Sequence, residues 1–357
     1  MRGQGHQIFV NELNRFAADA ADPRVAAIAR RVAAPLRVSV SGRRGVGRGT
    51  VAHALDRAGS RRGIVVTPPS GAADVAVYVI AEVVKPEDRD AIVAARHPVL
   101  VVLNKADLTA PPSGRVPDGP IAVARGRCRY FSMLTGAPTE PMAGLLAVAA
   151  LDDLLDDGLW AALRALARSL YSDTPDPLAA ARPAVSAAVW RRLVDTLDAF
   201  GITLAVAAVQ QGRPDRDVRT LLRHVSGVDA VVEQITALGA EALYLRILDA
   251  VAELEALAVT DGRLREFLSS DDTVIARMAA AQRVVGEAGP EAERSDDPVR
   301  HLLRAVRWQR YGRAPLSVVH RCCGADIVRG SLRLWSRCDG SPRSSTPVAG
   351  GRTGDSP

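Results

Sequence analysis

Residues 41–50 read SGRRGVGRGT and directly follow a β-branched run, LRVSVSG at residues 36–42. Gly42 and Gly47 frame four intervening residues, and a helical pattern begins behind them. A strand, a Gly-x-x-x-x-Gly loop and a helix together cradle phosphate, because glycines let backbone N–H groups turn inward and the helix N-terminus adds partial positive charge. The predicted phosphate-binding residues are Gly42, Arg44, Gly45, Val46, Gly47, Arg48, Gly49 and Thr50. The alternative is an ordinary glycine turn between a strand and a helix.

Strands alternating with short helices follow this loop. The segments that read as strands are GIVVT (63–67), DVAVYVIA (74–81), PVLVVLNKAD (98–107) and, with its loop, RCRYFSMLTG (127–136). Helical patterns at residues 50–58 and 86–97 lie between them, and the Pro- and Gly-rich residues 109–127 read as a loop with at most one short helix. This alternation predicts an α/β fold with a mostly parallel sheet and helices on both faces.

The rest of the chain reads as helix. Asp22 followed by Pro23 is the signature of a helix cap, and apolar residues recur at helical spacing beyond residue 141. One helix is expected over residues 228–259. The predicted parts are N-terminal helices at 1–33, the α/β domain at 34–140, an all-α helical domain at 141–336 and a disordered tail at 337–357.

A second motif, NKAD, ends the apolar strand that precedes it. Asn104, Lys105 and Asp107 match NKxD, the guanine-specificity motif of GTP-binding proteins, in a chain with only two lysines. The Asp107 carboxylate can accept two hydrogen bonds from the ring N–H and the exocyclic amine of guanine, a pair of donors that adenine does not offer. We expect Asn104 to buttress the loop and reach the base, and the aliphatic stem of Lys105 to lie over the ring.

The order of these motifs resembles the P-loop GTPases of the translation-factor-like and Era-like type. The stretch RVAAPLRVSVSGRRGVGRGT is most similar to bacterial dynamin-like GTPases, which also carry a helical bundle after the GTPase domain. The resemblance covers residues 24–150 and implies a P-loop GTPase-like domain at 34–140 with GTP or GDP as its ligand. It also implies that SMLTG, through the backbone at Ser132 and Met133, contacts the guanine oxygen.

Several residues depart from the family pattern, and all of them concern the metal or the γ-phosphate. Arg48 stands where the family has lysine, and Gly49 stands where it has the magnesium-binding Ser or Thr, with Thr50 one position late. Residues 67–71, TPPSG, lack the aspartate of DxxG, and only residues 59–62 remain where a switch loop belongs. Because phosphoryl transfer depends on metal and positioning, we expect weak use of Mg²⁺ and weak or no intrinsic GTP hydrolysis, and we assign no catalytic residue.

No metal site is expected elsewhere in the chain. His320, Cys322, Cys323 and Cys338 could offer four zinc ligands near the end, but adjacent cysteines chelate poorly and no CxxC pair exists. Cysteine packed in a helix as a small apolar residue is the preferred interpretation.

Charge and hydropathy bear on partners and location. The net charge of +6 is spread along the chain without an aromatic-rich basic run, so a nucleic-acid partner is not expected. The longest apolar run, residues 200–209, is half the length of a membrane span, and the N-terminus lacks the apolar block of a secretory signal. We therefore expect a cytoplasmic protein, with peripheral membrane contact left open, and a protein partner or self-association through the helical domain.

The sequence favours a guanine-nucleotide-binding regulatory protein with a degenerate GTPase domain. One alternative is an active dynamin-like GTPase in which Arg48 and Thr50 substitute for the usual pair and self-assembly or a membrane stimulates turnover. Another is an interaction scaffold whose GTPase-like domain holds no nucleotide. A P-loop kinase acting on ATP is disfavoured, because NKAD would then have no role.

Overall fold

A computed structural model describes residues 5–68, 71–109, 119–169, 182–286, 297–312 and 316–339. The chain divides into two compact units, one made of Met1–Ala33 with Leu243–Pro357 and the other of Ala34–Ala242. The N-terminal helices thus belong with the last helices of the chain, and the helices that directly follow the sheet belong to the unit of the sheet. This grouping differs from the four consecutive parts expected from the sequence. Of the predicted tail, residues 340–357 lie outside the described residues.

Five parallel strands form the sheet of the second unit, in the order β2-β1-β3-β4-β5. The strands are β1 (Leu36–Gly42), β2 (Ile64–Thr67), β3 (Val75–Ala81), β4 (Val99–Asn104) and β5 (Thr139–Met142). Four of them lie where the β-branched runs predict them. The expectation of a mostly parallel sheet is confirmed.

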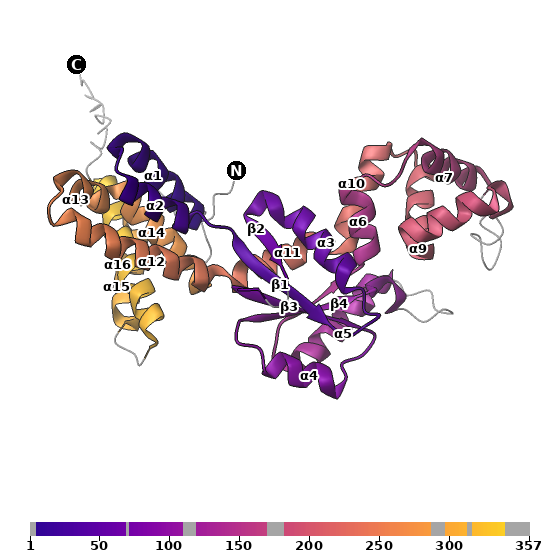
Figure 1. Ribbon diagram of the computed structural model, residues 1–357, viewed down its shortest axis with the longest axis horizontal. Helices are drawn as coiled ribbons and strands as arrows, with labels where there is room; N and C mark the ends of the chain where they lie inside the picture. Colours follow the sequence, from indigo (N-terminus) through magenta and orange to yellow (C-terminus); the bar gives the residue numbers. More distant parts are fainter. Residues whose placement is uncertain are drawn as a thin grey trace, which may run out of the picture. The chain divides into compact units, whose positions relative to one another are not determined.

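Helices cover both faces of this sheet (Figure 1). On one face, α4 (Pro86–Val93) and α5 (Gly119–Thr135) pack over alternate side chains of β3 and β4, among them Ile80 and Leu103. On the other face lie α3 (Arg48–Gly59) and α11 (Val228–Leu238). Because the central strands are buried on both sides, β4 is apolar along nearly its whole length.

The predicted last strand at residues 127–136 is wrong, since these residues belong to α5, which ends at Thr135. Ala124, Cys128 and Phe131 are the buried side chains of this helix, and their spacing of four and three residues is helical. The last strand is β5, which begins at Thr139. Of the expected loop at 109–127, residues 110–118 lie outside the described residues and the others from residue 119 are helical.

The helices α6 (Gly144–Leu151), α7 (Asp157–Ser169), α9 (Ala187–Gln210) and α10 (Asp215–Ser226) follow β5 and share one apolar core. By length and mean hydropathy, 1.5 over its best window, α9 is apolar enough to cross a membrane. Leu193, Leu197, Ile202 and Val206 of α9 are fully buried in this core. We therefore interpret α9 as a core helix.

The single helix expected over residues 228–259 is two helices, α11 and α12 (Ala240–Ala258), which meet at Gly239. A Cβ at Gly239 would lie 2.4 Å from Cδ2 of Leu36, the first residue of β1. The break thus lets the chain pass closely over a buried strand, a long-range contact that helical periodicity does not report.

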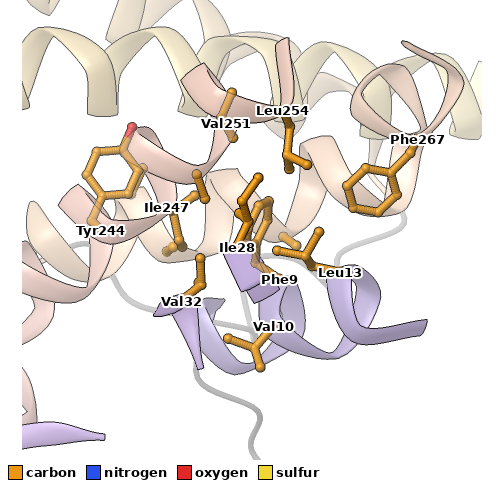
Figure 2. Close-up of a cluster of buried hydrophobic side chains, with 14 of the residues drawn as sticks. Phe9, Val10, Leu13, Ile28, Val32, Tyr244, Ile247, Val251, Leu254 and Phe267 are labelled. Carbon is orange, nitrogen blue, oxygen red and sulfur yellow. The ribbon is translucent and has the colours of Figure 1, made fainter. Parts of the chain in front are cut away.

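In the other unit, α1 (Gly5–Ala20) and α2 (Pro23–Val32) pack against α12 and α13 (Gly262–Ser269). Figure 2 shows Phe9, Leu13 and Ile28 facing Val251 and Leu254 across this core. The expected cap of α2 is present, because the Asp22 side chain accepts a hydrogen bond from the Arg24 N–H. The helices α14 (Asp271–Val284), α15 (Pro298–Tyr311) and α16 (Val318–Asp339) complete the unit.

The close approach at Gly239 predicts that Gly239→Ala destabilises the sheet unit. The new methyl group would push the Leu36 side chain, which is 2 % exposed, and overpacking of this kind costs about 1–3 kcal/mol. Gly126→Ala is the matched control, because Gly126 lies within α5 and a Cβ there would meet nothing within 4 Å, so alanine should stabilise the helix. Thermal unfolding should give a lower midpoint for the first variant alone, and equal midpoints would contradict the packing at Gly239.

Candidate functional site

The ends of the parallel strands bring the two sequence motifs to one edge. Gly42 is the last residue of β1 and Asn104 the last of β4, with β3 between them. In open α/β sheets, ligands bind outside the carboxyl ends of the strands where the strand order reverses, and in the order 2-1-3-4-5 this point lies between β1 and β3. The loop after β1 begins at that point.

The loop after β1 has a backbone conformation that depends on glycine. Gly45 and Gly47 have φ values of 85° and 84°, in the left-handed region that favours glycine. Helix α3 starts at Arg48. Its N-cap residue is Gly47, which has no side chain to bond the first N–H groups of the helix. The first N–H groups of an α-helix have no intrahelical partner, so those of Arg48, Gly49 and Thr50 point toward any ligand at this end.

The side-chain amide of Asn104 connects this loop with two other parts of the edge. Its Nδ2 donates to the carbonyl oxygen of Val46 at 2.8 Å, and its Oδ1 accepts from the N–H of Gly144 at 3.0 Å. Asn104 is 4 % exposed. The expected support of the glycine loop by Asn104 is therefore present, and the same side chain also holds the start of α6.

Lys105 and Asp107 follow on the same edge. Lys105 has a φ of 56° and is exposed, and Asp107 lies half-buried in a 3-10 turn, Ala106–Thr109. Burial is the main cause that raises the pKa of Asp107, and the negative charge of Asp198 raises it further. Among the described residues, no arginine or lysine forms an ion pair with this carboxylate.

Three arginines of the loop have different surroundings. Arg44 and Arg48 are exposed, and neither forms an ion pair with an acidic residue in the described part of the chain. Arg43 instead donates from Nε to Oδ1 of Asp88 at 2.8 Å. The guanidinium groups of Arg44 and Arg48 are therefore available for an anion at the start of α3.

Asp88 is fully buried and ties the loop to α4. Its carboxylate also accepts from the Tyr78 hydroxyl at 3.0 Å and from the Lys85 N–H at 2.8 Å. Burial and the hydrogen bond to Asp88 raise the pKa of Tyr78 to about 12, and the same carboxylate raises the pKa of Arg43. Sequence patterns did not point to the pairing of Arg43 with Asp88, whose one signal is that Asp88 lies in the first turn of α4.

Ser132 and Met133 are not brought to this edge. They lie in the last turns of α5, which ends just before the amino end of β5, where Thr139 pairs with Val101. The segment at the carboxyl end of β5 is Ala143 and Gly144. In the sequence, this position is marked by a short strand, two small residues and a helix, TEPMAGLLA at residues 139–147.

The segment between α3 and β2, where the resembled GTPases have a switch loop, is short in this chain. Helix α3 passes into β2 through a 3-10 turn, Ser60–Arg62, and Gly63, which leaves no long loop there. Of residues 67–71, Pro69 and Ser70 lie outside the described residues. Across the described ranges, no group of three or more His, Cys, Asp or Glu side chains could hold a metal ion, and Cys323 is buried in the core of the other unit.

Comparison of the chain with protein-family models, with curated protein sequences and with solved structures finds no match.

The Arg43–Asp88 pair predicts that Arg43→Met destabilises the sheet unit by roughly 1–3 kcal/mol, because the buried carboxylate loses a charged hydrogen-bond partner. Arg44→Met is the matched control, since the neighbouring arginine has no such partner in the described chain. Urea unfolding measures both, and the pair variant with Asp88→Asn should recover part of the loss. Equal stability of the two single variants would show that Asp88 does not depend on Arg43.

Proposed function

We propose that this chain binds GTP or GDP at the carboxyl edge of the sheet and acts as a guanine-nucleotide-binding regulatory protein with weak or no intrinsic hydrolysis. The observation that carries the proposal is the Asn104 side chain, which bonds both Val46 of the glycine loop and Gly144. Through this amide, a loop suited to phosphate and a motif suited to guanine share one rigid edge.

Phosphate binding rests on the start of α3. The backbone N–H groups after Gly47 favour an anion at this end, and so do Arg44 and Arg48, which pair with no acidic residue of the described chain. A guanidinium can bond phosphate oxygens in a bidentate manner, so Arg48 can take the charge-neutralising role of a lysine.

Base recognition rests on Asp107. A carboxylate only accepts hydrogen bonds, and guanine presents a ring N–H beside an amine at the edge that Asp107 would meet. In the described part of the chain Asp107 forms no ion pair, and the groups that stabilise its carboxylate are its own backbone N–H and the charge of Lys105. On this proposal the guanine donors add to them. We assign no backbone contact with the guanine oxygen, because the N–H groups of Ala143 and Gly144 at the end of β5 already donate to Ser226 and Asn104.

Weak hydrolysis follows from the missing ligands. Gly49 offers no oxygen to a magnesium ion, and the short turn between α3 and β2 leaves no room for a switch loop. Mg²⁺ is held by few protein ligands and keeps most of its waters, so losing these few ligands weakens the binding of the ion beside the phosphates.

The first prediction from this proposal concerns the metal. Titration calorimetry should detect binding of GDP and GTP, weaker binding of ATP, and a change of less than about threefold when EDTA replaces Mg²⁺, because the protein supplies few ligands to the ion. Gly49→Ser should introduce a dependence on Mg²⁺ by supplying a hydroxyl. Magnesium-dependent GTP turnover by the parent at about 1 per second would instead indicate an active GTPase, and absence of all nucleotide binding would support the scaffold alternative.

The second prediction concerns the base. Asp107→Asn should weaken GDP binding by roughly 2–4 kcal/mol, because hydrogen bonds to a charged group are lost and the new amide meets the guanine donors unfavourably. Xanthosine diphosphate should bind this variant better than GDP, since its carbonyl accepts from the amide. Asp90→Asn, an exposed change on α4, should leave both affinities unchanged. Equal GDP affinity of the parent and Asp107→Asn would exclude NKAD as the base-recognition motif.

A further inference from the structure

Helix α15 is buried on one face and apolar on the opposite, exposed face. Its buried side chains are His301, Ala305 and Trp308, whose spacing of four and three residues defines the inner face. On the far side of the helix lies an outer stripe of four aliphatic side chains that are 37–63 % exposed: Val299, Leu302, Leu303 and Val306. Among the described helices, no other exposes as many large apolar side chains. A contiguous exposed patch of this kind marks a surface that a partner covers.

The charges that accompany the outer stripe are all positive. From Pro298 to Ala325 the sequence holds six arginines and no aspartate or glutamate. Arg310, one turn after Val306, is exposed and forms no ion pair in the described part of the chain. A partner that covers the stripe therefore has to bring anionic groups together with apolar ones.

A cavity of about 430 Å³ borders the stripe at the C-terminal end of α15. The rings of Trp308 and Tyr311 meet edge to face in its wall, with centroids 4.9 Å apart. Arg307, one turn after Leu303, connects the cavity with the stripe. The remaining lining residues come from the end of α14 and the start of α16: Val284, Val285 and His320. Such a hollow beside an apolar stripe suits an anchoring side chain of a protein partner.

These features distinguish between the possible partners. In a symmetric pair of chains α15 would meet α15, so arginines would oppose arginines. An anionic lipid surface matches the stripe and its charges, but it has no side chain of fixed shape to fill the cavity. An amphipathic helix with acidic flanks supplies apolar side chains at the required spacing, carboxylates for the guanidinium groups and an anchor for the cavity.

We propose that the outer face of α15 is a docking surface for an acidic amphipathic helix of another protein. The outer stripe and the cavity receive its apolar side chains, and Arg310 pairs with one of its carboxylates. This role goes beyond the proposed function, because α15 belongs to the unit of Met1–Ala33 with Leu243–Pro357 and the nucleotide site to the other unit. The two are therefore tested separately.

The test uses the full chain and a labelled synthetic helix of about 15 residues, in which leucine recurs at i, i+3, i+4 and i+7 and glutamate fills the other positions. Fluorescence anisotropy should show saturable binding that weakens as salt is added. The same peptide with lysine in place of glutamate is the matched control and should not bind, because its charges repel the arginines.

Variants of α15 locate the contact. Leu303→Ser should weaken binding of the acidic peptide by about tenfold, as expected for an apolar residue at the centre of an interface, and Arg310→Glu by a similar factor. Tyr311→Ser, which removes part of the cavity wall, should also weaken it. Val259→Ser, at a position that is 77 % exposed and outside α15, should leave the affinity unchanged. All four positions are exposed, so the thermal midpoints should match that of the parent.

Three outcomes would overturn the proposal. The first is equal peptide affinity, or no peptide binding, in the parent, Leu303→Ser and Arg310→Glu. The second is binding of the parent to phosphatidylglycerol vesicles, lost in Leu303→Ser, without binding of the peptide, which would assign the face to a membrane. The third is dimerisation in sedimentation experiments that Leu303→Ser abolishes, which would assign it to a second copy of the chain. Failure of the parent to bind GDP would overturn the proposed function and leave this inference standing.

Discussion

The buried amide of Asn104 is the interaction on which the carboxyl edge of the sheet depends. A buried side-chain amide has to find partners for both its oxygen and its nitrogen, and here one partner belongs to the loop after β1 and the other to the start of α6. Glycines at both contacts make room for the amide, because a Cβ at Gly47 would lie 2.3 Å from Nδ2 and one at Gly144 would lie 2.9 Å from Oδ1. The loop, the strand end and the helix start therefore hold one another in place.

A second buried polar contact holds the other side of the loop. Asp88 gathers the Arg43 guanidinium, the Tyr78 hydroxyl and a backbone N–H, so the loop is fixed to β3 and α4 as well as to β4. Polar groups in a low-dielectric interior are costly when unpaired, and this makes both contacts strong constraints on the loop. What is lacking relative to the resembled GTPases concerns the metal and switch segments, whereas the residues that fix the loop to the sheet are present.

Local patterns predicted most of the sheet, and contacts distant in sequence account for what they missed. The runs at β1 to β4 are rich in β-branched residues, and β3 and β4 are buried along most of their length, so their strand character is visible in a short window. RCRYFSMLTG misled because aromatic residues and cysteine favour strands, yet Cys128 and Phe131 face the sheet from a helix. The pairing of Arg43 with Asp88 depends on the tertiary fold, because the two residues lie 45 positions apart in the sequence. Its only local sign is that Asp88 lies in the first turn of α4.

The charges along this edge change sign from one end to the other. Arg44 and Arg48, without an acidic partner in the described chain, lie with the start of α3 at the β1 end, while the Asp107 carboxylate follows β4. A nucleotide has the opposite polarity, with anionic phosphates at one end and, in guanine, a row of N–H donors at the other. On the proposed function, an adenine base would bring a ring acceptor to the Asp107 carboxylate, and repulsion between lone pairs would oppose its binding. Asp107 would therefore select the base through what it excludes as much as through what it binds, while the arginines supply the charge that elsewhere comes partly from a metal ion.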